Sequence, residues 1–85
     1  MASYSVFTKH SAAKELAGLT LSERRHVVER IEALSMDPKP RSSEKLSGQE
    51  KYRIRQCDLR VLYAIDDRDA TVTIVNVGHR RDVYR

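Results

Sequence analysis

Three short β-rich segments follow one another in the second half of the chain, and they constrain the fold more than any other feature. The segments are KYRIRQ, LRVLYAID and TVTIVNV, which begin at Lys51, Leu59 and Thr71. Each is rich in residues that favour strands, and only CD and about DRDA lie between them. Strands joined by such short connections pair as consecutive antiparallel hairpins. The sequence therefore predicts a three-stranded β-meander.

The apolar residues of the three segments agree on one register. If CD forms a tight turn, Ile54 faces Val61, and if the next turn centres on RD, Tyr63 faces Ile74. All the large apolar residues then share one face, and a slip of one residue would break this agreement. We expect the face that packs under the helices to consist of Tyr52, Ile54, Val61, Tyr63, Ile65, Val72 and Ile74.

The same register gathers arginines on the opposite face of the sheet. Arg53, Arg55 and Arg60 lie together there, with Arg55 directly opposite Arg60. Like charges across a ladder destabilise a sheet, so fold stability alone does not explain this placement. One explanation is a binding surface for an anion. The alternative is that the arginines pair with acids and only solvate the sheet, the candidates being Glu50, Asp58, Asp66 and Asp82.

Apolar residues continue the arginine face, which is therefore part cationic and part apolar. The residues that the register assigns to it are Leu62, Ala64, Val75 and Val77. His79 has the parity of Val77, so we expect its imidazole to lie beside the arginines. The closing segment HRRDVYR would then complete a site whose other half is the arginine cluster.

The first half of the chain predicts a strand and two helices. Alternation predicts a strand over Tyr4–Thr8, and apolar spacing predicts a short helix over about residues 9–17. Thr20 starts a capping box for a longer amphipathic helix that Pro38 stops near residue 37, and a loop, PKPRSSEKLSGQE, follows. We therefore expect one α+β domain over residues 1–85, a two-layer sandwich with an N-terminal strand, an antiparallel helical hairpin and the meander.

Composition narrows the class of protein. The formal net charge is +4, which favours a polyanionic partner but also suits a merely solubilising surface. The single cysteine, Cys57, excludes an internal disulfide, and no apolar run is long enough for a signal peptide or a membrane span. No spacing of His, Cys and Asp indicates a metal site, and no glycine-rich phosphate loop is present. We expect a soluble cytoplasmic protein without a cofactor.

Three motifs, in this order and spacing, resemble those of RelE-type toxins of the RelE/ParE superfamily. They are YRIR, DLRVLYAI and VGHRRDVY, and the resemblance extends to the KLSG before the meander. It implies a small α/β sandwich that cleaves mRNA in the ribosomal A site without a metal. It also implies a RelB-like antitoxin as partner, and a toxin–antitoxin heterotetramer that binds operator DNA through the antitoxin.

The resemblance assigns functional residues position by position. The basic-x-basic strand of the family falls on Arg53 and Arg55, and the arginine of the next strand falls on Arg60. The basic position after VG falls on His79 or Arg80, and the C-terminal tyrosine on Tyr84. Some members have lysines at the first two positions, and some continue into a further helix after the tyrosine.

These residues suit attack of an RNA 2′-hydroxyl on the adjacent phosphorus. Arginines supply fixed positive charge to the phosphorane but are poor bases. Tyr84 is the candidate base or a group that stacks on a nucleobase, and Arg80 or His79 the candidate on the acid side. Glu44 is either a base that swings in or, as we favour, an exposed loop acid. The candidate catalytic residues are thus Arg55, Arg60, His79, Arg80 and Tyr84, and the candidate phosphate-binding residues are Lys51, Arg53, Arg55, Arg81 and Arg85.

Two rival functions fit the same fold. One is a ParE-like inhibitor of DNA gyrase, which binds a protein and cleaves nothing. The other is a non-catalytic module that binds RNA or an antitoxin. Damaged DNA in cells would favour the first, and normal growth when the chain is expressed alone would favour the second.

Overall fold

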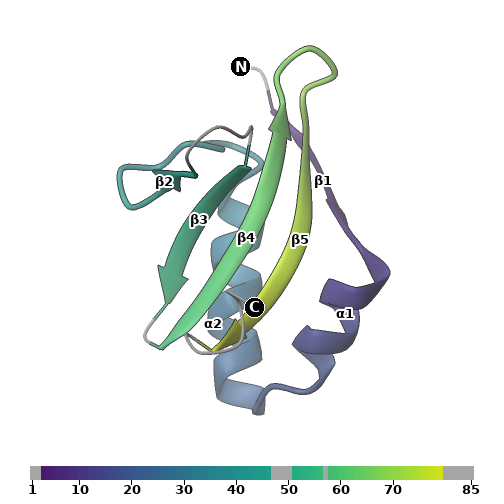
Figure 1. The fold of residues 1–85 in the computed structure, drawn as a ribbon, viewed down its shortest axis with the longest axis vertical. Coiled ribbons are helices and arrows are strands. Elements are labelled where there is room, and N and C mark those ends of the chain that lie inside the picture. The colour runs from purple at the N-terminus through teal and green to yellow at the C-terminus, as the bar shows by residue number, and fades with distance from the viewer. Residues whose placement is uncertain (1–2, 47–50, 57, 80–85) are drawn as a thin grey trace.

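The computed structural model describes residues 3–46, 51–56 and 58–79, which form two helices and a single sheet (Figure 1). The elements, in chain order, are β1 (Ser5–Thr8), α1 (His10–Ala17), α2 (Leu21–Ala33), β2 (Glu44–Lys45), β3 (Lys51–Gln56), β4 (Leu59–Asp66) and β5 (Thr71–His79). The predicted α+β class, with a strand, two helices and a meander, is confirmed.

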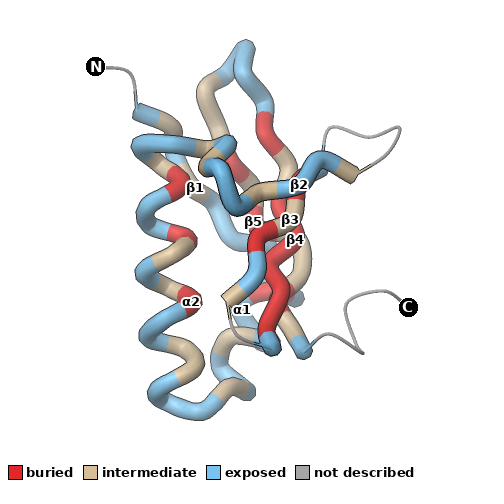
Figure 2. Tube along the Cα trace, turned by 90° about the vertical axis from the view of Figure 1, so that its left-hand side faces the viewer, coloured by how far each residue is buried: buried red, intermediate tan, exposed pale blue. Residues whose placement is uncertain are grey.

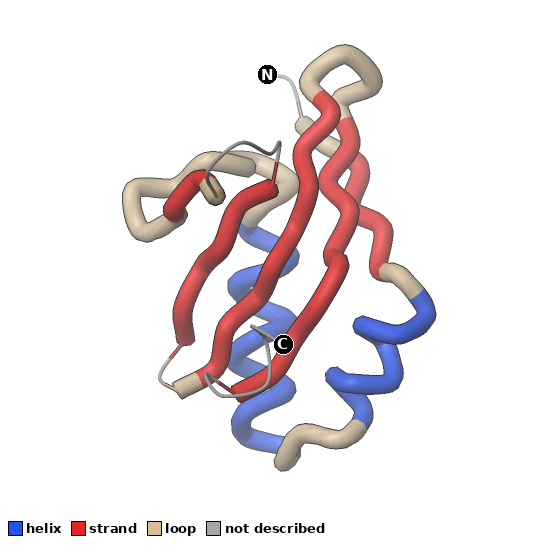
Figure 3. The backbone as a smooth tube through the Cα atoms, viewed as in Figure 1, coloured by secondary structure: helices blue, strands red, loops and turns tan. Residues whose placement is uncertain are grey.

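The sheet is mixed, and its strand order is β1-β5-β4-β3-β2 (Figure 3). The three strands of the meander and β2 pair antiparallel. The N-terminal strand instead pairs parallel to β5, with Ser5 opposite Thr71. The chain thus brings its first and last described strands side by side, and the meander lies between β1 and β2.

The β3–β4 register is the predicted one along its whole length. Ile54 faces Val61, Tyr52 faces Tyr63, and Arg55 faces Arg60. The residues expected under the helices are all buried in one core cluster. The rings of Tyr52 and Tyr63 stack within it at a centroid distance of 5.9 Å. Register and burial therefore agree, as the alternation of side chains requires.

The β4–β5 register is the predicted one only as far as the pair Tyr63–Ile74. A β-bulge follows, so Leu62 faces Asn76 and the remaining pairs are shifted by one residue. The prediction that Val77 lies on the arginine face is therefore wrong: its side chain belongs to the core and is 1% exposed. A bulge inserts one extra residue in one strand, which exchanges the two faces for every residue beyond it.

Helix α2 lies along one face of the sheet, with its buried positions turned toward the strands (Figure 2). The predicted capping box is present: the Glu23 backbone N–H donates to the Thr20 hydroxyl, and the Thr20 backbone N–H donates to the Glu23 carboxylate. The helix ends at Ala33, with Leu34 as its C-cap, whereas the sequence predicted an end near residue 37. The helices contribute Ala12, Val27 and Ile31 to the core, and the C-cap residue Leu34 joins them.

The segment predicted as a loop after α2 contains one short strand. Strand β2 has two residues, Glu44 and Lys45, and pairs with β3 at Arg53 and Tyr52.

Among the helices of the described residues, none is long and apolar enough to cross a membrane.

Candidate nucleic-acid interface

The sheet face that points away from α2 carries the three arginines that the register predicted. Arg55 lies opposite Arg60, and Arg53 lies opposite Leu62. Lys51 has the same parity and extends the row along β3, opposite Ala64. We call Lys51, Arg53, Arg55 and Arg60 the basic face. Its members come from two adjacent strands, so the backbone ladder fixes their spacing.

The arginines of the basic face differ in exposure. The Arg53 side chain is 13% exposed and that of Arg55 is 54% exposed. Arg60 is the one charged residue among the buried ones of the described chain, at 9% exposure. A guanidinium keeps its charge when it is covered, because its pKa lies far above neutral pH. The basic face therefore presents the Arg55 guanidinium to solvent, and the largely covered Arg53 and Arg60 add fixed positive charge to it.

Glu44 supplies an acid to the basic face that the sequence analysis did not place there. It lies on β2 directly opposite Arg53, and its carboxylate accepts a hydrogen bond from the Arg53 guanidinium. The other carboxylate oxygen lies 3.6 Å from Nη2 of Arg55. The Arg53 hydrogen bond and charge, with smaller contributions from Arg55 and Arg60, hold the pKa of Glu44 below its usual value.

This arrangement corrects one expectation about the acids. The candidates for pairing with the arginines were Glu50, Asp58, Asp66 and Asp82, and Glu44 was favoured as an exposed loop acid. The Glu44 side chain is indeed half exposed, but it bridges two arginines from a strand. A two-residue strand with no apolar side chain gives no alternation, so its pairing with Arg53 could not be found from sequence.

His79 does not lie beside the arginines. It pairs with Leu59, and its Nε2 is 4.0 Å from Oε2 of Glu23 on α2. The expectation that its imidazole joins the basic face is therefore wrong, because the bulge reverses its parity together with that of Val77. The nearby charge of His79 is one of the causes that lower the pKa of Glu23, after its hydrogen bonds with Thr20.

The other candidates of the closing segment fall outside the described residues. These are Arg80, Arg81, Tyr84 and Arg85, together with the possible ion-pair partners Glu50 and Asp82. Their proposed roles in catalysis and phosphate binding stay predictions.

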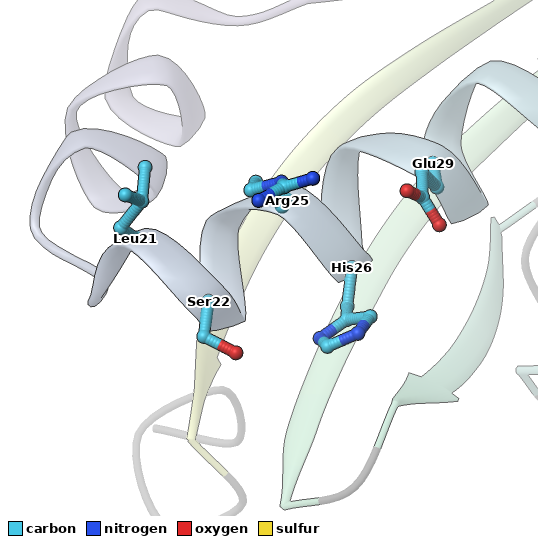
Figure 4. Close-up of a pocket in the computed structure, with 5 residues that line it drawn as sticks. All are labelled: Leu21, Ser22, Arg25, His26 and Glu29. Carbon is cyan, nitrogen blue, oxygen red and sulfur yellow. The ribbon is translucent and has the colours of Figure 1, made fainter.

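Two hollows in the described surface lie at α2 rather than at the basic face. One, of about 300 Å³, is lined entirely by α2 residues, namely Leu21, Ser22, Arg25, His26 and Glu29 (Figure 4). The other, of about 210 Å³, lies between α2 and the β3–β4 turn and is lined by Ser22, Glu23, His26, Gln56, Asp58 and Leu59. Neither includes a residue of the basic face. Within the described ranges, no group of three His, Cys, Asp or Glu side chains could hold a metal ion.

The chemistry of the basic face therefore suits the binding of anions. Arginines offer paired N–H groups that match phosphate oxygens, and here they are fixed on a sheet. They cannot accept a proton near neutral pH. Glu44, whose pKa is lowered, is ionised at neutral pH.

Solved structures place this fold among toxins of bacterial and archaeal toxin–antitoxin systems. A chain of the RelBE2 toxin–antitoxin complex from Mycobacterium tuberculosis is 32% identical, with a TM-score of 0.83 over 93% of this chain and 100% of that one. A chain of the archaeal RelE–RelB complex from Pyrococcus horikoshii is 28% identical, with a TM-score of 0.83 over 92% and 96%. The intact RelBE complex of E. coli contains a chain with the same fold, at 23% identity and a TM-score of 0.79 over 89% and 95%.

The family model described as ParE toxin of the type II toxin–antitoxin system matches residues 6–84. The chain therefore belongs to this toxin family, within the RelE/ParE superfamily that the sequence motifs indicated. No match was found among curated protein sequences.

Proposed function

We propose that this toxin is a ribosome-dependent endoribonuclease that cleaves mRNA in the ribosomal A site. The observation that carries the proposal is the basic face: Arg55 opposite Arg60, with Arg53 beside them on the same face. Such a cluster opposes sheet stability and suits a phosphate backbone. The similarity to RelE structures, at up to 32% identity among those described above, supports the same assignment.

The reaction that fits these residues is transesterification without a metal. The RNA 2′-oxygen loses its proton and forms a bond to phosphorus, and the bond from phosphorus to the 5′-oxygen breaks. The leaving oxygen takes up a proton, and the 5′ fragment ends in a cyclic phosphate. Arg55 and Arg60 stabilise the charge that builds up on the phosphorane oxygens, since fixed donors in a site of this kind act on the transition state. Arg53 and Lys51 hold neighbouring phosphates.

The proton transfers belong to other groups. The lowered pKa of Glu44 makes it a weak base, and His79 faces α2. We therefore assign the base or base-stacking role to Tyr84 and the acid-side role to Arg80. Arg81 and Arg85 are assigned to contacts with RNA.

The proposed partner is a RelB-type antitoxin in the cytoplasm. The similar structures from M. tuberculosis and P. horikoshii are toxin–antitoxin complexes. An antitoxin segment with acidic side chains would complement the basic face and compete with RNA there. We also propose that the toxin and antitoxin form a heterotetramer that binds operator DNA through the antitoxin.

Inhibition of DNA gyrase is the second candidate, because the matching family model is described by the ParE toxin. A gyrase inhibitor needs a protein-binding surface but no groups that act on RNA phosphate. Substitutions in the basic face distinguish the two functions. They should abolish RNA cleavage, whereas inhibition of gyrase does not require these arginines to act on phosphate.

A cleavage assay on stalled ribosomes tests the proposal. Purified toxin is added to ribosomes that hold a defined codon in the A site, and primer extension maps the cut, with free RNA and EDTA as controls. We expect a cut within the A-site codon that persists in EDTA, is absent from free RNA and is lost in Arg60→Ala or Tyr84→Phe. An intact message with folded protein would reject the proposal, and supercoiling by gyrase would be the next assay.

A further inference from the structure

The Glu44 carboxylate lies between two arginines of the basic face. One oxygen accepts a hydrogen bond from Arg53, and the other lies 3.6 Å from the guanidinium of Arg55. Arg60, opposite Arg55 on β4, adds a third positive charge that acts on the same carboxylate. An anionic group with two oxygens is therefore already bound at the centre of the arginine cluster.

A phosphodiester has the same charge and a comparable pair of oxygens. Its two non-bridging oxygens carry one negative charge, and guanidinium groups bind them with the geometry that they use for carboxylates. RNA that binds to Arg53 and Arg55 must therefore share these donors with Glu44 or displace it.

The position of Glu44 allows its displacement. The Glu44 side chain is 53% exposed and that of Arg55 is 54% exposed, and an ion pair exposed on both sides adds little stability. Strand β2, which carries it, has two residues and occupies the end of the sheet. The carboxylate can leave Arg55 at small cost, and on the mostly covered Arg53 a phosphate oxygen can take its place. Until it is displaced, it lowers the positive potential that RNA meets.

We propose that Glu44 is an intramolecular competitor of RNA that makes the toxin selective against free RNA. The inference rests on the proposed function, since it assumes that RNA binds the basic face. A ribosome that fixes the mRNA next to the toxin raises the effective concentration of phosphate and overcomes the competitor. Free single-stranded RNA has no such advantage, so the Glu44 carboxylate keeps the affinity of the toxin for free RNA low.

Binding of a single-stranded oligoribonucleotide without ribosomes tests the inference. Fluorescence anisotropy would give the Kd of wild type, Glu44→Gln, Glu29→Gln and Arg55→Ala over a range of salt concentrations. Glu29 is the matched control, because it is exposed on α2 and its substitution adds the same net charge away from the basic face. Circular dichroism would confirm that each variant is folded.

We expect Glu44→Gln to bind roughly two- to fivefold more tightly than Glu29→Gln, the range that an exposed ion pair allows. Its plot of log Kd against log salt should also be steeper by about 0.7, as for one additional cation at a single strand. Equal affinities of the two glutamine variants, with weaker binding by Arg55→Ala, would overturn the role of Glu44 but keep RNA on the basic face. Unchanged binding by Arg55→Ala as well would overturn both the inference and the proposed function.

Discussion

The Glu15 carboxylate on α1 accepts a hydrogen bond of 2.9 Å from the backbone N–H of Val77 on β5. Strand β1 ends at Thr8, opposite Ile74, so it no longer pairs with β5 at this point. The side chain of Glu15 takes over as hydrogen-bond acceptor where the neighbouring strand stops. It joins the helix to β5 just beyond the bulge, where Val77 enters the core.

Glu15→Ala should lower the free energy of unfolding by about 1–2 kcal/mol, because it leaves a partly covered N–H without its acceptor. Urea unfolding followed by circular dichroism measures this change. Glu29→Ala removes an exposed carboxylate from α2 and should change the stability far less. Equal losses in the two variants would show that the hydrogen bond to Val77 contributes nothing.

The capping box of α2 gives a second stability prediction. Thr20→Ala removes the acceptor of the Glu23 N–H, and we expect a loss of about 1 kcal/mol. Thr20→Ser keeps the oxygen and should retain most of the stability. Thermal unfolding of the three proteins measures the difference, and a serine variant as unstable as the alanine variant would contradict it.

Tyr63 should make stability depend on pH in the alkaline range. Burial raises the pKa of its phenol to about 12, and the phenol donates a hydrogen bond of 2.8 Å to the Pro38 carbonyl. In the unfolded chain, the Tyr63 phenol ionises near its ordinary pKa of 10. Its contribution to the free energy of unfolding is therefore complete below pH 10 and falls as the pH rises toward 12.

Comparison with Tyr63→Phe isolates this contribution. The variant loses the hydrogen bond to Pro38 at neutral pH, at a cost of about 1 kcal/mol. Between pH 10 and pH 12, wild type should lose about 2 kcal/mol more than the variant. Urea unfolding at several alkaline pH values gives both curves, and parallel curves would argue against a raised pKa.

Arg55→Ala tests the basic face in catalysis. We expect the rate of cleavage on stalled ribosomes to fall by about 10²-fold, as when one donor to a transition-state oxyanion is removed. The fold should be retained, because the side chain is half exposed. Arg25→Ala, on α2 behind the sheet, removes the same charge and should leave the rate nearly unchanged. A similar fall in both variants would indicate a general effect of net charge.

His79→Gln gives the opposite expectation. Since the imidazole faces Glu23, the cleavage rate of the variant should stay within about threefold of the wild-type rate. Loss of one contact to the transition state would lower the rate by more than this. Single-turnover cleavage at several pH values measures it. A large loss, with a changed pH profile, would restore His79 to the acid-side role.

The sequence predicted those parts of the fold that repeat a pattern. Alternation in β3 and β4 fixed their register, and the Thr20 capping box located the start of α2. The arginine cluster followed from that register alone. These features depend on residues that are close in sequence or joined by a short hairpin, so they can be predicted from local sequence patterns.

The β-bulge of β5 and the bridge from Glu44 to Arg53 have no repeating pattern in the sequence. The bulge is visible only as two adjacent apolar residues, Ile74 and Val75, which interrupt the alternation of TVTIVNV. Reading them as a break would have moved Val77 into the core and His79 toward α2. The bridge from Glu44 to Arg53 joins a short strand to a distant one, and pairing of that kind depends on the whole sheet.

The parallel pairing of β1 with β5 has a consequence for synthesis of the toxin. Ser5 is made early but pairs with Thr71, so the N-terminal strand has no neighbour until most of the chain has left the ribosome. Contacts so distant in sequence form slowly and late. The sheet that carries the basic face is therefore completed only after Arg53, Arg55 and Arg60 have all been made.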